Sequence, residues 1–408
     1  MIVSPDGAQH LTYCLNIHPG ETWAENFAAI RDHALRVRQA VAPAKAFALG
    51  LRLGHVAAGE LERGEAMNRF REFLAAEDLY APTINGFPYG PFHGTAVKED
   101  VYRPDWRTPE RLDYTRTLMD ILAALLPAGV AGSISTVPGA YKPWVRTDED
   151  VARIARGLCE AALHAAEIHE RTGKDLCLAL EPEPDCYIET TDEALALFAE
   201  TLPRLGPATA RALNVPPDRL ADAVRRHLGV CFDTAHAAVQ FEDPAESLAR
   251  LAAAGVRVPK VQLSSALRLA PTDSALRRLR NFADPVYLHQ ARLRLADGAV
   301  RRYSDLPEAI ARAGRERADK AELRVHFHVP LFFDRSGELA STRTGLDEAF
   351  WNRVIPGTDP PAAAGPDHLE IETYTFDVLP DDLRDDDVAD SIRKEYDWVL
   401  SKLPRRHA

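Results

Sequence analysis

The stretch from Gly229 to His236 reads Gly-Val-Cys-Phe-Asp-Thr-Ala-His, an apolar run that breaks into an acid, a hydroxyl and an imidazole. This pattern is typical of a buried strand whose carboxyl end carries polar residues of a functional site. Asp233 and His236 are therefore candidates for holding a metal ion or touching a substrate. The alternative is that Asp233 caps the next helix and His236 is an ordinary residue of its first turn.

Three more polar side chains stand at or near the ends of apolar runs: Glu181, Gln262 and Glu372. If these runs are parallel strands of one barrel, their carboxyl ends open onto one face and the side chains converge there. Carboxylates crowded into a partly buried mouth repel one another unless they share protons or a cation. We therefore predict a divalent ion. Oxygen ligands favour Mg²⁺ or Mn²⁺, and Zn²⁺ or Co²⁺ would be suited if histidine joins. The alternative is that these acids are only helix caps or salt-bridge partners.

Two of the acids have a second acid two residues away. Pro182 follows Glu181 at the end of its apolar run, which favours Glu181 over Glu183 as the residue at the strand terminus. Glu372 is favoured over Glu370, because the later residue lies nearer the open end of the strand.

His326 and His328 are also two residues apart, so on an extended backbone both point to one side. That spacing can supply a pair of metal ligands. The alternative is that one histidine fills a polar slot while the other is exposed.

The elements that must position these residues are short apolar runs alternating with helical patterns. The runs are 11–17, 47–53, 81–87, 132–137, 176–180, 230–232, 261–263 and 369–375. Such alternation predicts an α/β fold of the (β/α)8 TIM-barrel type, with residues 1–408 as a single domain.

The alternation is interrupted before the last strand. Glu372 comes 110 positions after Gln262, whereas one strand-helix unit uses roughly 30. We therefore expect an insertion at 266–366, containing a hairpin, a helix and the His-x-His segment, that lies over the barrel mouth. Residues 381–408 should supply a C-terminal helix.

Composition and charge limit the classes of function and the cellular location that we expect for this chain. A formal net charge of -12 argues against nucleic acid as a partner, since phosphate binding needs clustered Lys and Arg. The five cysteines form no Cys-x-x-Cys pair, which suits a reducing cytoplasm. The sequence begins without a basic-then-apolar leader and has no run of about 18 apolar residues, so we expect a cytoplasmic chain with no direct membrane insertion.

Four segments carry a resemblance to known proteins. The chain resembles the xylose isomerase-like superfamily of TIM barrels, and within it most closely the EboE family of metabolite-traffic proteins. The segments are Leu-Thr-Tyr-Cys with Asn-Ile-His-Pro-Gly-Glu (11–21), Lys-Val-Gln-Leu-Ser-Ser-Ala-Leu (260–267), His-Phe-His-Val-Pro-Leu (326–331) and His-Leu-Glu-Ile-Glu-Thr-Tyr-Thr (368–375).

The resemblance implies a set of metal ligands. The superfamily pattern of Glu, Asp-x-x-His, His and Glu makes Glu181, Asp233 and Glu372 look like ligands and His236 like a residue that contacts substrate or a second ion. Gln262 stands where the pattern has His. Either Gln262 serves as a ligand, or His326 or His328 reaches in from the insertion.

The resemblance also implies a metal-dependent isomerase or epimerase acting on a hydroxylated small molecule, with Glu181 and Glu372 exchanging a proton and His236 orienting a hydroxyl. The EboE likeness adds a metabolite-export pathway, whose other proteins would be partners. Two alternatives stay open: a phosphoesterase or endonuclease IV-like hydrolase, and a barrel that binds a metabolite without turning it over. Candidate substrate-binding residues are Tyr13, His18, Arg52, Asn85, His93 and Trp144.

Overall fold

The computed structural model describes residues 1–4, 6–91, 93, 98–316, 320–355, 365–381 and 383–403. The inner sheet has eight parallel strands in the order β1-β14-β7-β6-β5-β4-β3-β2, and a parallel bridge between Cys14 and Gly50 joins its two edges. The chain is therefore a (β/α)8 barrel. Its strands are β1 (His10–Tyr13), β2 (Phe47–Arg52), β3 (Leu79–Asn85), β4 (Gly132–Thr136), β5 (Leu176–Leu180), β6 (Leu228–Asp233), β7 (Arg257–Leu263) and β14 (His368–Ile371).

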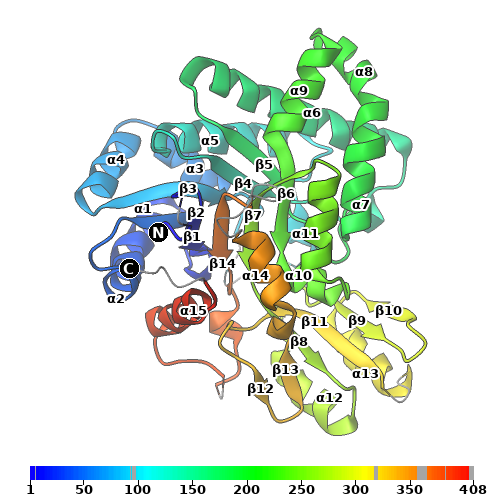
Figure 1. Cartoon of the computed structure of the whole chain (residues 1–408). Helices are drawn as coiled ribbons and strands as arrows, with labels where there is room; N and C mark the ends of the chain where they lie inside the picture. The colour runs from blue at the N-terminus through cyan, green and yellow to red at the C-terminus, as the bar shows by residue number, and fades with distance from the viewer. Residues whose placement is uncertain are drawn as a thin grey trace.

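Helices cover the outside of this barrel (Figure 1). They are α1 (Trp23–Ala29), α2 (Leu35–Val41), α3 (His55–Glu62), α4 (Ala66–Ala76), α5 (Pro109–Leu125), α6 (Asp148–Thr172), α7 (Thr191–Ala196), α8 (Leu202–Leu213), α9 (Pro217–His227), α11 (Pro244–Ala253), α14 (Glu348–Val354) and α15 (Val388–Lys402). The short helix α10 (Thr234–Val239) is buried and packs instead against β7 and the segment that follows it. No helix in the described part of the chain is both long and apolar enough to cross a membrane.

Local sequence explains the sharp boundaries of these elements. The longest helix, α6, begins at a capping box, in which the Thr147 hydroxyl accepts from the Asp150 amide and the Asp150 carboxylate accepts from the Thr147 amide. It ends at Gly173, whose φ of 71° suits a residue without Cβ. The next strand, β5, is Leu-Cys-Leu-Ala-Leu and is buried throughout, as expected of a parallel strand covered on both sides.

The segment between β7 and β14 builds a second sheet. It has six strands in the order β10-β9-β11-β8-β13-β12, and every neighbouring pair is antiparallel. The strands are β8 (Ala266–Leu269), β9 (Ala291–Arg294), β10 (Val300–Tyr303), β11 (Glu322–His328), β12 (Arg335–Ser336) and β13 (Leu339–Ser341).

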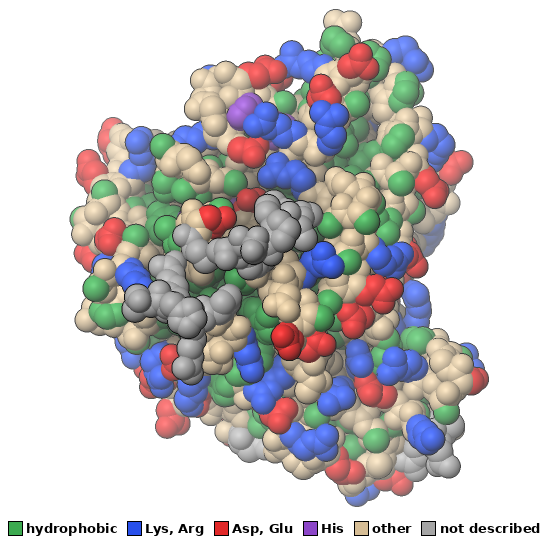
Figure 2. Space-filling model, viewed as in Figure 1, with side chains coloured by type: hydrophobic (Ala, Val, Ile, Leu, Met, Phe, Trp, Pro, Cys, Tyr) green, Lys and Arg blue, Asp and Glu red, His purple; other side chains and the backbone are tan. Residues whose placement is uncertain are grey.

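This second sheet has its own apolar core with helices α12 (Asp273–Leu279) and α13 (Leu306–Glu316). Only Ser264 and Ser265 separate β7 from β8, so the chain passes directly from the barrel into the second sheet. Its yellow and orange elements lie together beside one end of the barrel (Figure 1). The surface on the viewed face mixes acidic and basic side chains (Figure 2).

Candidate functional site

The carboxyl ends of the barrel strands bring four predicted residues to one place. Asp233 ends β6, Gln262 lies near the end of β7, and Glu181 and Glu372 follow β5 and β14 directly. All four are at least 96% buried. The convergence follows from parallel pairing, because Asp233 is in register with Gln262 and Gln262 with Glu370.

Three histidines meet these carboxylates. His236 lies in α10, while His326 and His328 come from β11 of the second sheet. The ring centroids of His236 and His326 are 4.5 Å apart, and those of His326 and His328 are 5.3 Å apart. Ligand-type atoms lie within 4.8 Å of one another in three overlapping sets: His236, His326 and His328; Glu181, Asp233 and His236; Asp233, His328 and Glu372.

Backbone carbonyls fix which imidazole nitrogen carries the proton. His236 Nδ1 lies 2.9 Å from the carbonyl oxygen of Pro182, and His328 Nδ1 lies 2.9 Å from that of Glu372. A carbonyl oxygen only accepts, so each Nδ1 must donate. Nε2 of each neutral ring is then left with a lone pair, which is the state that binds a metal.

The two carboxylate oxygens of Asp233 differ in their hydrogen bonding. Its Oδ1 accepts from the amides of Ala235 and His236 at 2.7 and 2.9 Å, and from the Ser264 hydroxyl at 2.7 Å. Asp233 is thus the cap of α10, as one reading of the sequence suggested. Capping occupies only Oδ1, so the carboxylate remains available as a ligand through Oδ2.

Several buried polar atoms of the site have no hydrogen-bond partner among the described residues. They are Asp233 Oδ2, Glu372 Oε2, His326 Nε2 and His328 Nε2. A buried polar atom normally finds a partner, because leaving it unpaired costs about 1 to 3 kcal/mol. Carboxylate oxygens and imidazole nitrogens are both ligands of Zn²⁺ and of other divalent first-row ions. The residues therefore fit a divalent ion.

Amide side chains hold the two glutamates. Asn16 and Asn85 each turn Nδ2 toward Glu372 Oε1, at 2.9 and 3.4 Å. Gln262 satisfies its contacts best with its nitrogen toward Glu181, where it donates to the two carboxylate oxygens at 2.8 and 3.2 Å. In that orientation Gln262 acts on Glu181 as a donor; its prediction as a metal ligand stays a prediction.

Burial dominates the electrostatics of the carboxyls. It raises the pKa of Glu181 to about 8, with a further rise from the charge of Asp233. Burial also raises the pKa of Glu372 well above its usual range, and Glu181 and Asp233 add to that rise. Asp233 differs, because His236, His328 and its hydrogen bonds outweigh burial and lower its pKa.

The imidazoles respond to the same surroundings. Burial lowers the pKa of His328 to about 4 and that of His326 well below its usual range. The pKa of His236 rises instead: burial lowers it, but the charges of Asp233, Glu183 and Glu181 more than offset that effect.

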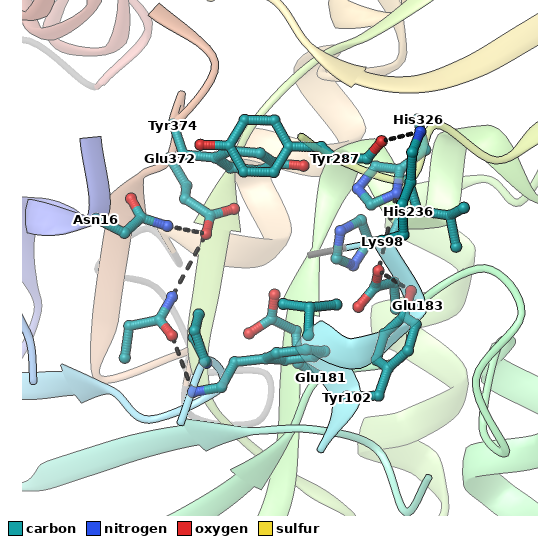
Figure 3. A pocket seen from close by; sticks show the side chains of 15 residues that line it. Asn16, Lys98, Tyr102, Glu181, Glu183, His236, Tyr287, His326, Glu372 and Tyr374 are labelled. Carbon is teal, nitrogen blue, oxygen red and sulfur yellow. Dashed lines mark hydrogen bonds and ion pairs between the residues drawn. The ribbon is translucent and has the colours of Figure 1, made fainter. Parts of the chain in front are cut away.

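A small pocket of about 60 Å³ opens above these groups. The barrel mouth, the β3–α5 connection and the second sheet all contribute to its lining, and Figure 3 shows the carboxylates and imidazoles facing a common space. The lining residues are Asn16, Asn85, Phe87, Pro88, Lys98, Val101, Tyr102, Glu181, Glu183, His236, Tyr287, Leu288, His326, Glu372 and Tyr374.

Of the predicted substrate-binding residues, Asn85 lines this pocket. His93 lies just behind the lining, with Nε2 2.6 Å from the Asn16 carbonyl oxygen and Nδ1 3.1 Å from the Tyr287 hydroxyl. The others do not line it: Tyr13, His18, Arg52 and Trp144.

Those four have contacts of their own. The Tyr13 hydroxyl lies 3.1 Å from His18 Nε2, and Arg52 donates to the carbonyl oxygens of Gly20 and Gly90. The Trp144 ring lies under the guanidinium of Arg103. Tyr13 and Arg52 thus end strands β1 and β2, and His18 and Trp144 lie in the segments after β1 and β4, with contacts outside the pocket lining.

Sequence reasoning missed several residues of the site, among them Asn16, Lys98, Tyr102, Glu183 and Gln290. Glu183 was set aside in favour of Glu181, yet it is buried, lines the pocket, and has a pKa raised to about 7, chiefly by burial. The Glu-Pro-Glu-Pro spacing was a usable signal, since both acids follow one strand. Gln290 carried no comparable signal.

Comparisons with known proteins give a fold likeness. No protein-family model matches the sequence, and no curated protein matches it. A D-tagatose 3-epimerase-like protein is 14% identical with a TM-score of 0.39, over 62% of this chain and 76% of that one. An IOLI protein with a bound zinc atom is 11% identical with a TM-score of 0.37, over 63% and 73%. An AP endonuclease of family 2 from Brucella melitensis is 12% identical with a TM-score of 0.35, over 62% and 78%. These values are too low to transfer an activity, so function must be inferred from this chain's own side chains.

Proposed function

We propose that this chain is a divalent-metal-dependent isomerase or epimerase that moves a proton next to the carbonyl carbon of a hydroxylated small molecule. The observation that carries the proposal is the pairing of unpartnered ligand atoms on Asp233, His326 and His328 with the two buried carboxyls of Glu181 and Glu372. Burial raises the pKa of both carboxyls, to about 8 for Glu181, and a raised pKa makes a carboxylate a stronger proton acceptor.

Asp233, Glu372 and His328 would hold the ion, with Glu181, His236 and His326 completing the set. When bound, a divalent ion supplies positive charge that stabilises negative charge developing on substrate oxygens. Glu181 and Glu372 both adjoin Asp233, so a substrate carbon between them would meet a carboxyl on either side. In this proposal one of the two removes the proton and the other returns it.

Neighbouring side chains would orient the Glu372 carboxyl and the substrate. Asn16 and Asn85 occupy Glu372 Oε1, which directs the other oxygen, Oε2, to the reaction. His236 is held by the Pro182 carbonyl at Nδ1, so its Nε2 can accept a hydroxyl hydrogen or bind an ion. The likeness of four segments to the EboE family supports placing this chemistry in a metabolite-export pathway, together with other proteins of that pathway.

A second candidate is a metal-dependent phosphoesterase of the endonuclease IV kind. The observation in its favour is the number of ligand-type groups: three histidines and three acids form overlapping sets, more than one tetrahedral ion requires. Paired ions are used by many phosphoesterases. The net charge of -12 favours a small molecule over a nucleic acid.

The test begins with elemental analysis of protein purified without chelator. We expect at least one bound divalent ion per wild-type chain and loss of that ion in Asp233→Ala. Ketose and aldose panels in deuterated water would then report exchange at the carbon next to the carbonyl. Glu181→Gln and Glu372→Gln should abolish exchange while leaving sugar binding detectable.

Other outcomes separate the alternatives. Wild-type protein without a divalent ion would overturn the proposal. Cleavage of an abasic duplex or of phosphate monoesters, without proton exchange, would favour the hydrolase. Tight metabolite binding with no turnover in any assay, unchanged by both glutamine variants, would indicate a binding barrel.

A further inference from the structure

Gln290, immediately before β9, is fully buried and joins the second sheet to the candidate site. We propose that Gln290 is a positioning residue that holds His326 in the tautomer able to bind a divalent ion, and that Tyr102 extends the same hydrogen-bond chain to Glu183. The inference deepens the proposed function and rests on it for the identity of the ion site.

The surroundings of the Gln290 amide decide its orientation. Its Nε2 lies 2.9 Å from the carbonyl oxygen of Pro184 and 2.8 Å from the hydroxyl of Tyr102. A carbonyl oxygen can only accept, so this end of the amide must be the nitrogen. The oxygen end is thereby turned toward His326.

His326 must therefore donate a hydrogen bond to the Gln290 oxygen. Its Nδ1 lies 2.7 Å from Gln290 Oε1, which has no hydrogen to give. Nδ1 therefore carries a proton and donates it to Gln290. Nε2 is left with a lone pair, has no partner among the described residues, and belongs to the set formed with His236 and His328.

The other end of the chain reaches a carboxyl of the pocket. The Tyr102 hydroxyl already accepts from Gln290, so its own proton goes to Glu183 Oε1, 2.8 Å away. Every donor from His326 through Gln290 and Tyr102 therefore points toward Glu183. Such a directed chain polarises its members in the same sense, and its lack of exposure keeps water from competing.

The side chain of Gln290 can be tested separately from its backbone. The His326 amide donates to the Gln290 carbonyl oxygen at 2.8 Å, and His289 Nδ1 lies 3.0 Å from the His326 carbonyl oxygen. Neither contact uses the Gln290 side chain. Gln290→Leu should therefore leave β11 in place while releasing the imidazole from its acceptor.

The experiment measures two quantities on the full chain. Nitrogen shifts of ¹⁵N-labelled histidine rings in metal-free protein report the tautomer of His326, assigned with His326→Gln. Chelator competition gives the Zn²⁺ dissociation constant. In the wild type we expect His326 protonated at Nδ1. In Gln290→Leu we expect loss of that preference and Zn²⁺ binding weaker by about 10- to 100-fold.

Gln240→Leu is the matched control. Gln240 also bridges barrel and second sheet, donating to Glu189 and accepting from Arg292, but lies outside the pocket lining. Its loss should change neither the His326 tautomer nor Zn²⁺ affinity. Gln290→Glu, whose protonated carboxyl can accept from His326 and donate to Pro184, should restore most of the affinity.

Two results would overturn the inference: His326 protonated at Nε2 in the wild type, or unchanged tautomer and Zn²⁺ affinity in Gln290→Leu. If Gln290→Leu does not fold, the wild-type tautomer and the Gln290→Glu affinity still decide. A wild type that binds no Zn²⁺ would contradict the proposed function, whereas the ring shifts of that protein would still support or overturn the role of Gln290.

Discussion

Lys260 and Glu370 form an ion pair inside the barrel, and neither side chain has any exposed surface. Lys260 lies on β7 two residues before Gln262, and Glu370 lies on β14 two residues before Glu372, so the pair is directly beneath the candidate site. Its cation is a nearby positive charge that lowers the pKa of Glu181, opposing the larger effect of burial. Charge balance within the barrel thus helps the chain tolerate several carboxyls at its mouth.

Removing one member of that pair should be costly. Lys260→Met leaves the Glu370 carboxylate buried without its cation, and we expect a loss of about 3 to 5 kcal/mol in the free energy of unfolding, measured by urea denaturation. The double variant Lys260→Met with Glu370→Met should recover much of that loss. A single variant as stable as the wild type would show that the pair contributes nothing.

The Glu370 carboxylate occupies space that is open because Gly50 has no side chain. A Cβ at Gly50 would lie 2.0 Å from Glu370 Oε1 and 2.8 Å from the Tyr13 carbonyl oxygen. Gly50→Ala should therefore destabilise by about 3 kcal/mol, because overpacking a rigid interior forces its neighbours to move. Gly206→Ala is the control: a Cβ there meets open space within helix α8, so we expect a small gain of about 0.5 to 1 kcal/mol. Thermal melting of the wild type and both variants measures these changes in stability.

Divalent ions should stabilise the fold through Asp233. At a free Zn²⁺ or Mn²⁺ concentration 100 times the dissociation constant, the expected gain is about 2.7 kcal/mol, seen as a rise in Tm and reversed by a chelator. Asp233→Asn retains an oxygen to cap α10 but loses the anionic Oδ2, so the rise should shrink. Asp243→Asn, at the corresponding cap of α11, should behave as the wild type. An equal rise in both variants would remove Asp233 from the ligand set.

Glu395 of α15 should make stability depend on pH. Burial raises its pKa from 4.5 to about 7, although its carboxylate accepts from the Leu331 amide and the Thr373 hydroxyl. A raised folded-state pKa means that its contribution is full below pH 4.5 and is lost as the pH rises to about 7.

Glu395→Gln isolates this effect. The amide oxygen can accept the same two hydrogen bonds without a charge, so the variant should gain on the wild type by on the order of 2 kcal/mol between acidic and neutral pH. Denaturation at a series of pH values gives the difference curve. Glu72→Gln, on an exposed part of α4, is the matched control. A flat curve for Glu395→Gln would mean that Glu395 titrates normally.

The sequence by itself determined the barrel and the first three acids of the site. Each strand is a local apolar run, and parallel pairing forces the carboxyl ends onto one face, so Glu181, Asp233 and Glu372 could be placed together without coordinates. The helix caps at Thr22 and Thr147 are equally local, because a capping box needs only residues three apart.

Only the tertiary structure decided what surrounds those acids. His326 and His328 reach the barrel mouth because β11 pairs between β8 and β9, a long-range arrangement that no local pattern encodes. The same holds for Gln290, whose partners His326, Tyr102 and Pro184 come from three separate parts of the chain. Strand ends are set by local hydrophobicity, whereas the tautomer of an imidazole and the partner of a buried amide are set by atoms within about 3 Å that sequence separation does not predict.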